Sequence, residues 1–323
     1  MRKLSILFLL VSGLIKGQKI ENYVSVLGNG ECRKNGNQII VLRKFSQNNK
    51  TYYFTVFPAT LKTEIVLSDS IKFKQESWQF IRKRFSTTPY IDALHQVENY
   101  GSGIQDAGFT HFLPSQKGFN LTIDLCPSRR PLDRDVFTEL INEVGKVETP
   151  VPLAISITGR WMNEHPDDLN WLKELDKSKK LDIVWVNHSY NHYTEKNVPL
   201  KMNFLLAPGT NLNAEVLNTE IALLEKGIVP SIFFRFPGLV SDPDIYDRIL
   251  NLGLIPVGSD AWLAKGQWPK EGSIVLIHAN GNEPIGVHDF LELLKKDQNE
   301  ILGKRWELFD LRKSIIDADE IKK

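Results

Sequence analysis

The hydrophobic positions of this chain follow one pattern up to about residue 111 and another from residue 119 onward. In the first part, apolar runs rich in β-branched and aromatic residues alternate with polar turns, which is typical of strands. Strands are expected at residues 39–42, 51–57 and 63–67, followed by helical segments near 76–85 and 91–97. The pattern therefore predicts a small α+β module over residues 18–112.

From residue 119 the pattern changes to a regular alternation of strand and helix. The expected strands are residues 120–125, 152–158, 181–186, 231–236, 254–257, 274–277 and 306–309. About seven such units in alternation are typical of a parallel barrel or of a doubly wound sheet. We expect this second unit to occupy residues 113–323.

The first residues carry the pattern of a secretory leader. Arg2 and Lys3 precede an apolar core over residues 4–15, which ends near Gln18. This core is too short to span a membrane, and no stop-transfer pattern follows it. The alternative is a buried N-terminal strand or helix, which the basic flank disfavours. We expect a signal peptide at residues 1–17 and a mature chain that is secreted or periplasmic, with no transmembrane segment.

Composition and charge narrow the class of protein further. A hydrophobic content of 42% is that of an ordinary globular chain. The 40 Lys and Arg residues nearly balance the 39 Asp and Glu residues, so nothing points to nucleic acid or to an anionic surface as partner. Cys32 and Cys126 are the only cysteines, which excludes a disulfide framework and favours two free thiols.

Four short blocks place polar, chemically active residues just beyond apolar runs. They are residues 122–128 (TIDLCPS), 188–192 (HSYNH), 235–238 (RFPG) and 272–278 (GSIVLIH). In a βα barrel the carboxyl ends of the strands meet at one rim, where acids, bases and metal ligands gather. Four blocks in this order therefore predict one active site.

His188 and His192 are the candidate metal ligands. If their segment turns helically, the spacing of four residues puts both imidazoles on one face, where they can share a divalent ion. Such a pair is often surface or core filler. Here the intervening Ser189 and the preceding apolar strand favour ligands, with zinc as the first candidate.

Asp124 and Arg235 are expected to act together. Asp124 ends a strand and is a candidate general base, with a metal ligand or a helix cap as alternatives. A nearby Arg235 would keep the carboxylate ionised by lowering its pKa. Pro237 and Gly238 after it predict a tight loop that contributes to substrate binding.

His278 is the candidate general acid, because a histidine titrates near the working pH. Asp260 is placed to accept a hydrogen bond from His278 and raise its pKa, although it could equally be a turn residue. Trp262 either packs the rim or offers a flat face to a sugar ring. Together these residues suit metal-assisted attack of water on an amide or ester.

The blocks resemble those of the polysaccharide deacetylases of the NodB-homology type, carbohydrate esterase family four, over about residues 118–316. The resemblance implies a distorted (β/α)7 barrel behind the small N-terminal α+β module. It implies that Asp124 is the base, Arg235 its partner and Asp260 the carboxylate beside His278. It also implies hydrolysis of N-acetyl or O-acetyl groups on a polysaccharide or oligosaccharide.

One position departs from that family's pattern. The family's first block reads Thr-Phe-Asp-Asp-Gly, whose second Asp completes a two-His, one-Asp metal site, whereas this chain has Leu125 there and Cys126 after it. Cys126 is a conceivable soft ligand, but it is expected to point elsewhere, because neighbouring side chains of an extended strand face opposite sides. The departure implies weak or absent metal binding. It leaves open a catalytically weak or inactive carbohydrate-binding barrel, or an amidase that acts on a small substrate.

Overall fold

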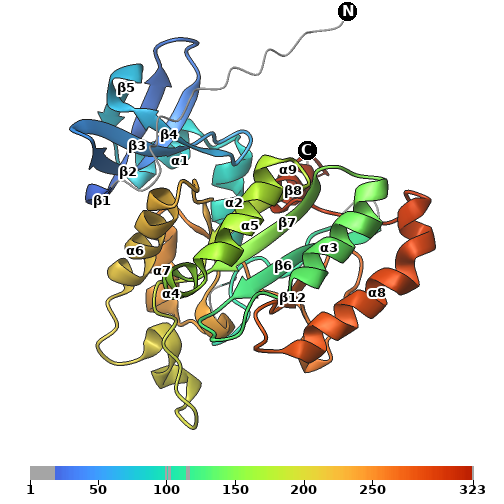
Figure 1. Cartoon of the computed structure of the whole chain (residues 1–323). Helices are drawn as coiled ribbons and strands as arrows, with labels where there is room; N and C mark the ends of the chain where they lie inside the picture. Colours follow the sequence, from blue (N-terminus) through green and yellow to red (C-terminus); the bar gives the residue numbers. More distant parts are fainter. Residues whose placement is uncertain (1–18, 99, 101–102, 114–116, 322–323) are drawn as a thin grey trace, which may run out of the picture.

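The computed structural model describes residues 19–98, 100, 103–113 and 117–321. The expected leader, residues 1–17, lies outside the described residues. Figure 1 shows two parts, a small sheet formed by the N-terminal residues and a larger unit of strands flanked by helices. No helix within the described ranges is long and apolar enough to cross a membrane.

The N-terminal part is a five-stranded antiparallel sheet followed by two helices. Its strand order is β4-β3-β2-β1-β5, with β1 (Glu21–Cys32), β2 (Gln38–Gln47), β3 (Lys50–Val56), β4 (Thr63–Leu67) and β5 (Ile71–Gln75). The helices are α1 (Trp78–Arg84) and α2 (Pro89–Val97). The three strands expected from the sequence correspond to β2, β3 and β4. The sequence pattern missed β1 and β5, whose apolar positions are sparse and interrupted by polar residues.

The larger part is built on a curled, mostly parallel sheet. Seven strands follow one another in the order β10-β9-β8-β7-β6-β12-β11, and an eighth, β13, pairs with β6. Their bounds are β6 (Gly118–Leu125), β7 (Val151–Ile157), β8 (Leu181–Asn187), β9 (Phe233–Phe234), β10 (Ile255–Pro256), β11 (Ala261–Trp262), β12 (Ile274–Ile277) and β13 (Glu307–Leu308). Strands β6, β7 and β12 are buried along their whole length, which explains their continuous apolar runs.

Helices between the strands cover the outside of this sheet. They are α3 (Arg134–Glu143), α4 (Gly159–Glu164), α5 (Pro166–Lys177), α6 (Leu212–Glu225), α7 (Pro243–Asn251), α8 (Pro284–Leu302) and α9 (Leu311–Ile321). Helices α3 and α8 pack side by side on the outer surface (Figure 1). The expected distorted (β/α)7 barrel with a small N-terminal α+β module is confirmed.

The segment that joins the two parts closes the barrel between β10 and β12. Phe109 donates a backbone hydrogen bond to Pro256 and accepts one from Gly258, at 3.0 and 2.8 Å. On the other side, the backbone N–H groups of Ile274 and Phe112 bind Thr110 and Gly272 at 3.1 and 2.9 Å. This segment therefore fills the gap that the strand order leaves open.

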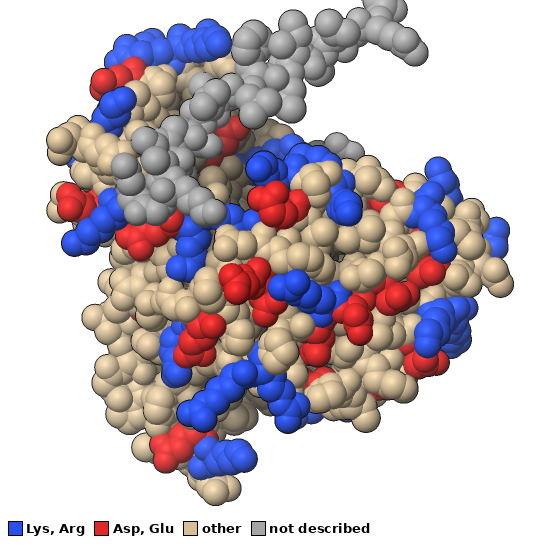
Figure 2. Space-filling view, in the orientation of Figure 1, with Lys and Arg blue, Asp and Glu red and all other residues tan. Residues whose placement is uncertain are grey.

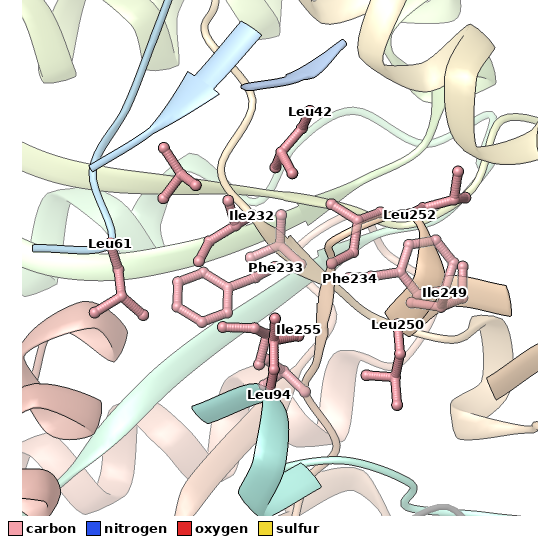
Figure 3. Packing of buried hydrophobic residues seen from close by; sticks show 14 of the residues in the cluster. Leu42, Leu61, Leu94, Ile232, Phe233, Phe234, Ile249, Leu250, Leu252 and Ile255 are labelled. Atoms are coloured by element: carbon pink, nitrogen blue, oxygen red, sulfur yellow. The ribbon is translucent and has the colours of Figure 1, made fainter. Parts of the chain in front are cut away.

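The N-terminal sheet packs firmly against the barrel. Figure 3 shows Leu42 and Leu61 of the N-terminal part approaching Ile232, Phe233 and Ile255 of the barrel, and all five belong to one buried apolar cluster. On the face seen in Figure 2, positive and negative side chains are interspersed, so neither sign gathers into a patch there.

Candidate active site

Strand ends place the four sequence blocks at one rim of the barrel. Asp124 is the penultimate residue of β6, His188 follows β8, Arg235 follows β9 and His278 follows β12. All four side chains are buried. Because these strands run parallel and pair in register, their carboxyl ends meet, and the structure brings the four residues together.

Arg235 anchors Asp124 from within the barrel. Its Nη1 donates to Asp124 Oδ1 at 3.0 Å and to Thr122 Oγ1 at 2.6 Å. Its Nη2 and Nε donate to the carbonyl oxygens of Gly258 and Val257, at 2.7 and 3.2 Å. Burial alone would raise the pKa of Asp124, but the charges of Arg235 and then His188 hold that pKa below its usual value. Asp124 is therefore a carboxylate at neutral pH.

Cys126, His188 and His192 form a buried cluster that could hold a metal ion. Cys126 Sγ lies 3.5 Å from His188 Nε2 and 3.3 Å from His192 Nε2. One donor atom of each residue lies within 4.8 Å of the others. Asp124 Oδ2 is also close, at 3.6 Å from His188 Nε2. Thiolate and imidazole are ligands that suit zinc and similar divalent ions, so the residues present fit a metal.

The expected direction of Cys126 was wrong. Side chains two apart along a strand face the same side, so Cys126 follows Asp124 into the site. Leu125 faces the opposite side and is fully buried in an apolar cluster with Ile157 and Trp161. The side chain of Leu125 therefore does not face the place where a third metal ligand would be needed.

A loop, and not a helix, brings the two histidines together. The sequence analysis had assumed a helical turn between them. Ser189 and His192 adopt left-handed conformations, with φ of 66° and 49°. The two imidazole centroids end 4.8 Å apart. Glu215 of α6 fixes this loop by accepting hydrogen bonds from the backbone N–H groups of Tyr190 and Asn191, at 2.9 and 2.8 Å. The sequence analysis did not identify Glu215, which carries no local signal.

A hydrogen bond orients the imidazole of His188, whereas Nδ1 of the His192 imidazole lacks a hydrogen-bond partner among the described residues. His188 Nδ1 lies 2.9 Å from the carbonyl oxygen of Arg235 and donates to it, so Nε2 is the nitrogen that faces Cys126. His192 Nδ1 is buried and has no hydrogen-bond partner among the described residues.

His278 is paired with Glu283 and not with Asp260. His278 Nδ1 lies 2.8 Å from Glu283 Oε2, within the distance of an ion pair, and Glu283 Oε2 accepts a hydrogen bond from Trp262 Nε1 at 2.7 Å. Burial disfavours the charged imidazole, but Cys126 and Glu283 outweigh it and hold the pKa of His278 well above its usual value. These neighbours favour the protonated form of His278, the form that a general acid requires.

The expected role of Asp260 beside His278 was wrong. Asp260 Oδ2 lies 2.8 Å from His111 Nδ1 and accepts a hydrogen bond from Ser273 Oγ at 3.2 Å. Its Oδ1 accepts one from the backbone N–H of Ile274 at 3.1 Å. Asp260 thus ties the closing segment to the start of β12. Glu283 lies only five residues after His278, and this short separation could have indicated it as the partner of His278.

Of the remaining predicted residues, Trp262 lies next to His278, and Gly238 packs against Phe204, a neighbour of His192. The Trp262 ring lies 5.9 Å from that of His278 and is partly exposed. Pro237 is buried, and Gly238 has φ of 61° with the Phe204 ring 2.5 Å from where a Cβ would stand. Only glycine allows Phe204 to pack there. The Phe204 ring in turn lies 5.8 Å from that of His192.

A cavity of about 620 Å³ opens beside the loop of His188 and His192. Residues of that loop, of the following segment and of α6 line it, among them Asn191, Tyr193, Met202, Phe204 and Glu215. The lining combines aromatic and apolar faces with amide and carboxylate groups.

Comparisons with known proteins give one partial family match and several similar structures. The sequence model of the RP012 protein N-terminal domain matches residues 32–91. A family 4 carbohydrate esterase from Bacillus anthracis is 20% identical with a TM-score of 0.47, covering 70% of this chain and 91% of its own. PdaA of Bacillus subtilis, a family 4 carbohydrate esterase, is 17% identical with a TM-score of 0.47, covering 72% and 90%.

A third structure, BA3943 of Bacillus anthracis, is described as a CE4 family pseudoenzyme. It is 12% identical with a TM-score of 0.46, and 90% of each chain is covered. The families and activities named in these descriptions are those of the three solved proteins.

Proposed function

We propose that this chain is an exported hydrolase that removes N-acetyl or O-acetyl groups from a polysaccharide. One observation carries the proposal. An ionised carboxylate, Asp124, and a protonated imidazole, His278, both lie beside the Cys126, His188 and His192 cluster. A base and an acid whose pKa values are driven apart at one site are what amide hydrolysis needs.

His188 and His192 would hold the divalent metal, with zinc as the candidate. The chemistry that a bound metal supplies there is polarisation of the acetyl carbonyl and stabilisation of the charge that develops on its oxygen. Asp124 Oδ2 accepts the proton of the attacking water, since Arg235 occupies Oδ1 and fixes the orientation of the carboxylate. His278 donates a proton to the leaving amine, and Glu283 orients its ring.

The substrate class follows from the walls of the site together with the resemblance of the motifs. Trp262 presents part of an aromatic face next to His278, and such faces suit the apolar side of a sugar ring. A glycan outside the cell agrees with the leader expected at residues 1–17. Mass spectrometry of the protein from its native source should show the chain starting near Gln18. An intact Met1 terminus would contradict export.

The activity is tested by measuring acetate released from oligomers of N-acetylglucosamine by the purified chain supplied with zinc, cobalt or nickel. We expect slow but measurable release. His278→Ala should lower the rate by about 10²–10⁴-fold, the usual contribution of a general acid. His288→Ala is the matched control, because His288 is an exposed histidine on α8 and should leave the rate unchanged.

Two outcomes would overturn the proposal. If neither N-acetylated nor O-acetylated glycans yield acetate with any of the three metals, the deacetylase is overturned and the carbohydrate-binding barrel becomes the favoured alternative. If His278→Ala keeps full activity, the acid has been assigned to the wrong residue.

A further inference from the structure

We propose that Cys126 is the anionic third ligand of the metal, forming a Cys–His–His centre with His188 and His192 that selects zinc and other thiophilic ions. This inference rests on the metal site of the proposed function and deepens it. Nothing in the pattern of the resembling family assigns a cysteine to the centre, since that pattern has glycine at this position.

The direction of the side chain is the first argument. Cys126 lies just beyond the end of β6, on the same side as Asp124, and its thiol is buried between two imidazoles. Asn280 Nδ2 donates to the carbonyl oxygen of Cys126 at 2.7 Å and so fixes the backbone at this point. Asn280 is itself fully buried, so the thiol is held by a rigid support.

The distances between donor atoms are the second argument. Four-coordinate zinc binds sulfur at about 2.3 Å and nitrogen at about 2.0–2.1 Å, which separates the two by about 3.5 Å in a tetrahedron. The sulfur of Cys126 lies 3.5 and 3.3 Å from the two Nε2 atoms. Both sulfur–nitrogen distances thus agree with those around a tetrahedral ion, and all three donor atoms lie within 4.8 Å of one another.

The orientation of the imidazoles is the third argument. His188 donates from Nδ1 to a backbone carbonyl, which is the outer-shell contact typical of zinc-bound histidines and leaves Nε2 free to bind. His192 also turns Nε2 toward the sulfur. Both imidazoles therefore present the same nitrogen to one point next to Cys126.

The assignment has a consequence for Asp124. With two imidazoles and a thiolate, the centre has three protein ligands, and the thiolate lowers the net positive charge of a bound divalent ion. Asp124 is then not drawn to the metal and keeps Oδ2 for the proton of water. A thiolate also favours zinc and cobalt over magnesium, calcium or manganese, which prefer oxygen ligands.

The experiment uses Co²⁺ as a spectroscopic probe of the chelator-stripped full chain. A thiolate bound to Co²⁺ gives an intense charge-transfer band in the near ultraviolet, which imidazole and carboxylate ligands do not give. Cys32 is the only other cysteine, so Cys32→Ala leaves Cys126 as the sole thiol. We expect the Cys32→Ala protein to show the band at one equivalent of Co²⁺ and to lose it when one equivalent of Zn²⁺ is added.

Variants at the site sharpen the test. Cys126→Ser should remove the band and weaken zinc binding more than about 100-fold, beyond the effect of losing an outer-shell contact. Cys126→Asp should restore zinc binding without the band. Leu125→Asp added to Cys126→Ser should not restore zinc binding, because that side chain faces the apolar cluster.

Absence of the band in Cys32→Ala, or its persistence in Cys126→Ser, would overturn the assignment. If Cys126→Ser does not fold, the spectrum of Cys32→Ala decides alone. A band without acetate release would refute the hydrolase and leave the metal centre standing. Acetate release without a band would support the hydrolase and refute Cys126 as a metal ligand.

Discussion

Two buried arginine–carboxylate pairs lie in different regions of this molecule and are used differently. One is at the junction of the N-terminal sheet with the barrel, where Arg43 of β2 meets Glu220 of α6. The other is at the rim of the barrel, where Arg235 meets Asp124. All four side chains are almost completely buried, so burial does not distinguish the pairs.

The junction pair is saturated. Arg43 Nε and Nη2 bind the two carboxylate oxygens of Glu220 at 2.8 and 2.9 Å, and the Tyr23 hydroxyl donates to Oε2 at 2.8 Å. Nη1 of Arg43 donates to the carbonyl oxygens of Leu42 and Leu252. Every strong contact of this carboxylate is used to hold two parts of the chain together.

In the rim pair, Arg235 binds one carboxylate oxygen of Asp124 and leaves the other without a hydrogen bond from the arginine. Arg235 binds only Oδ1 of Asp124, and Oδ2 faces His188 at 3.6 Å, beyond the length of a hydrogen bond. Arg235 donates its other hydrogen bonds to Thr122, Val257 and Gly258. Under the proposed function, the junction pair is a structural lock and the rim pair a positioned base, because Arg235 leaves Oδ2 of Asp124 outside its hydrogen bonds.

The largest effect is expected at the junction. Glu220→Gln leaves Arg43 buried without its counter-charge, so the free energy of unfolding should fall by about 3–5 kcal/mol. Denaturant unfolding measures it. Glu31→Gln is the control, because the pair of Glu31 with Lys72 is exposed, and it should cause no measurable change. Equal stability of both variants would show that the junction pair is not a lock.

Two matched lysine substitutions separate the roles of the arginines. Arg235→Lys keeps the charge but loses the fork that fixes Asp124, so the rate of acetate release should fall by about 10–100-fold. Arg43→Lys should lower stability and leave the rate of the folded protein unchanged. Rate loss of the same size in both would mean that the rim pair has no special function.

Glu283→Gln tests the support of the acid. The substitution keeps the shape but removes the charge that favours protonated His278, so acetate release should slow by roughly tenfold, less than on loss of the imidazole. The substitution also lets the pKa of His278 fall toward its usual value. Because the acid must be protonated, the decline of activity with rising pH should begin at a lower pH than in the wild type. An unchanged rate profile across pH would remove Glu283 from the site.

Tyr23→Phe is expected to have the smallest effect. It removes one hydrogen bond to a carboxylate that Arg43 still holds, so unfolding should become easier by about 1.5 kcal/mol. Acetate release should be unaffected. A rate change here would indicate that the junction communicates with the rim.

Much of the architecture could be predicted from the sequence, because it depends on local patterns. The buried parallel strands β6, β7 and β12 are continuous apolar runs, and polar residues at their ends gather at one rim whatever the details of the helices. Strands β1 and β5 were missed because their apolar positions are sparse, and their position is determined by pairing, of β1 with β2 and of β5 with β1.

The details of the site depended on contacts that no local pattern contains. The side chain of Cys126 enters the site because β6 stays regular up to its end, which the resemblance to an Asp-Asp-Gly block concealed. Asp260 and Glu283 both lie near His278 in sequence, and only the path of the loops decides that Glu283 reaches it. Glu215 and Glu220 lie on one helix, α6, and their roles depend on segments distant in the chain.

The most direct test of the account compares Asp124→Asn with Glu220→Gln, both loaded with zinc to equal content and assayed under conditions where each is folded. Asp124→Asn should release acetate about 10²–10⁴-fold more slowly than the wild type, since the proton acceptor is lost. Glu220→Gln should keep the wild-type rate while unfolding at lower denaturant. Full activity of Asp124→Asn would contradict the assignment of Asp124 as the base and, with it, the distinction between the two pairs.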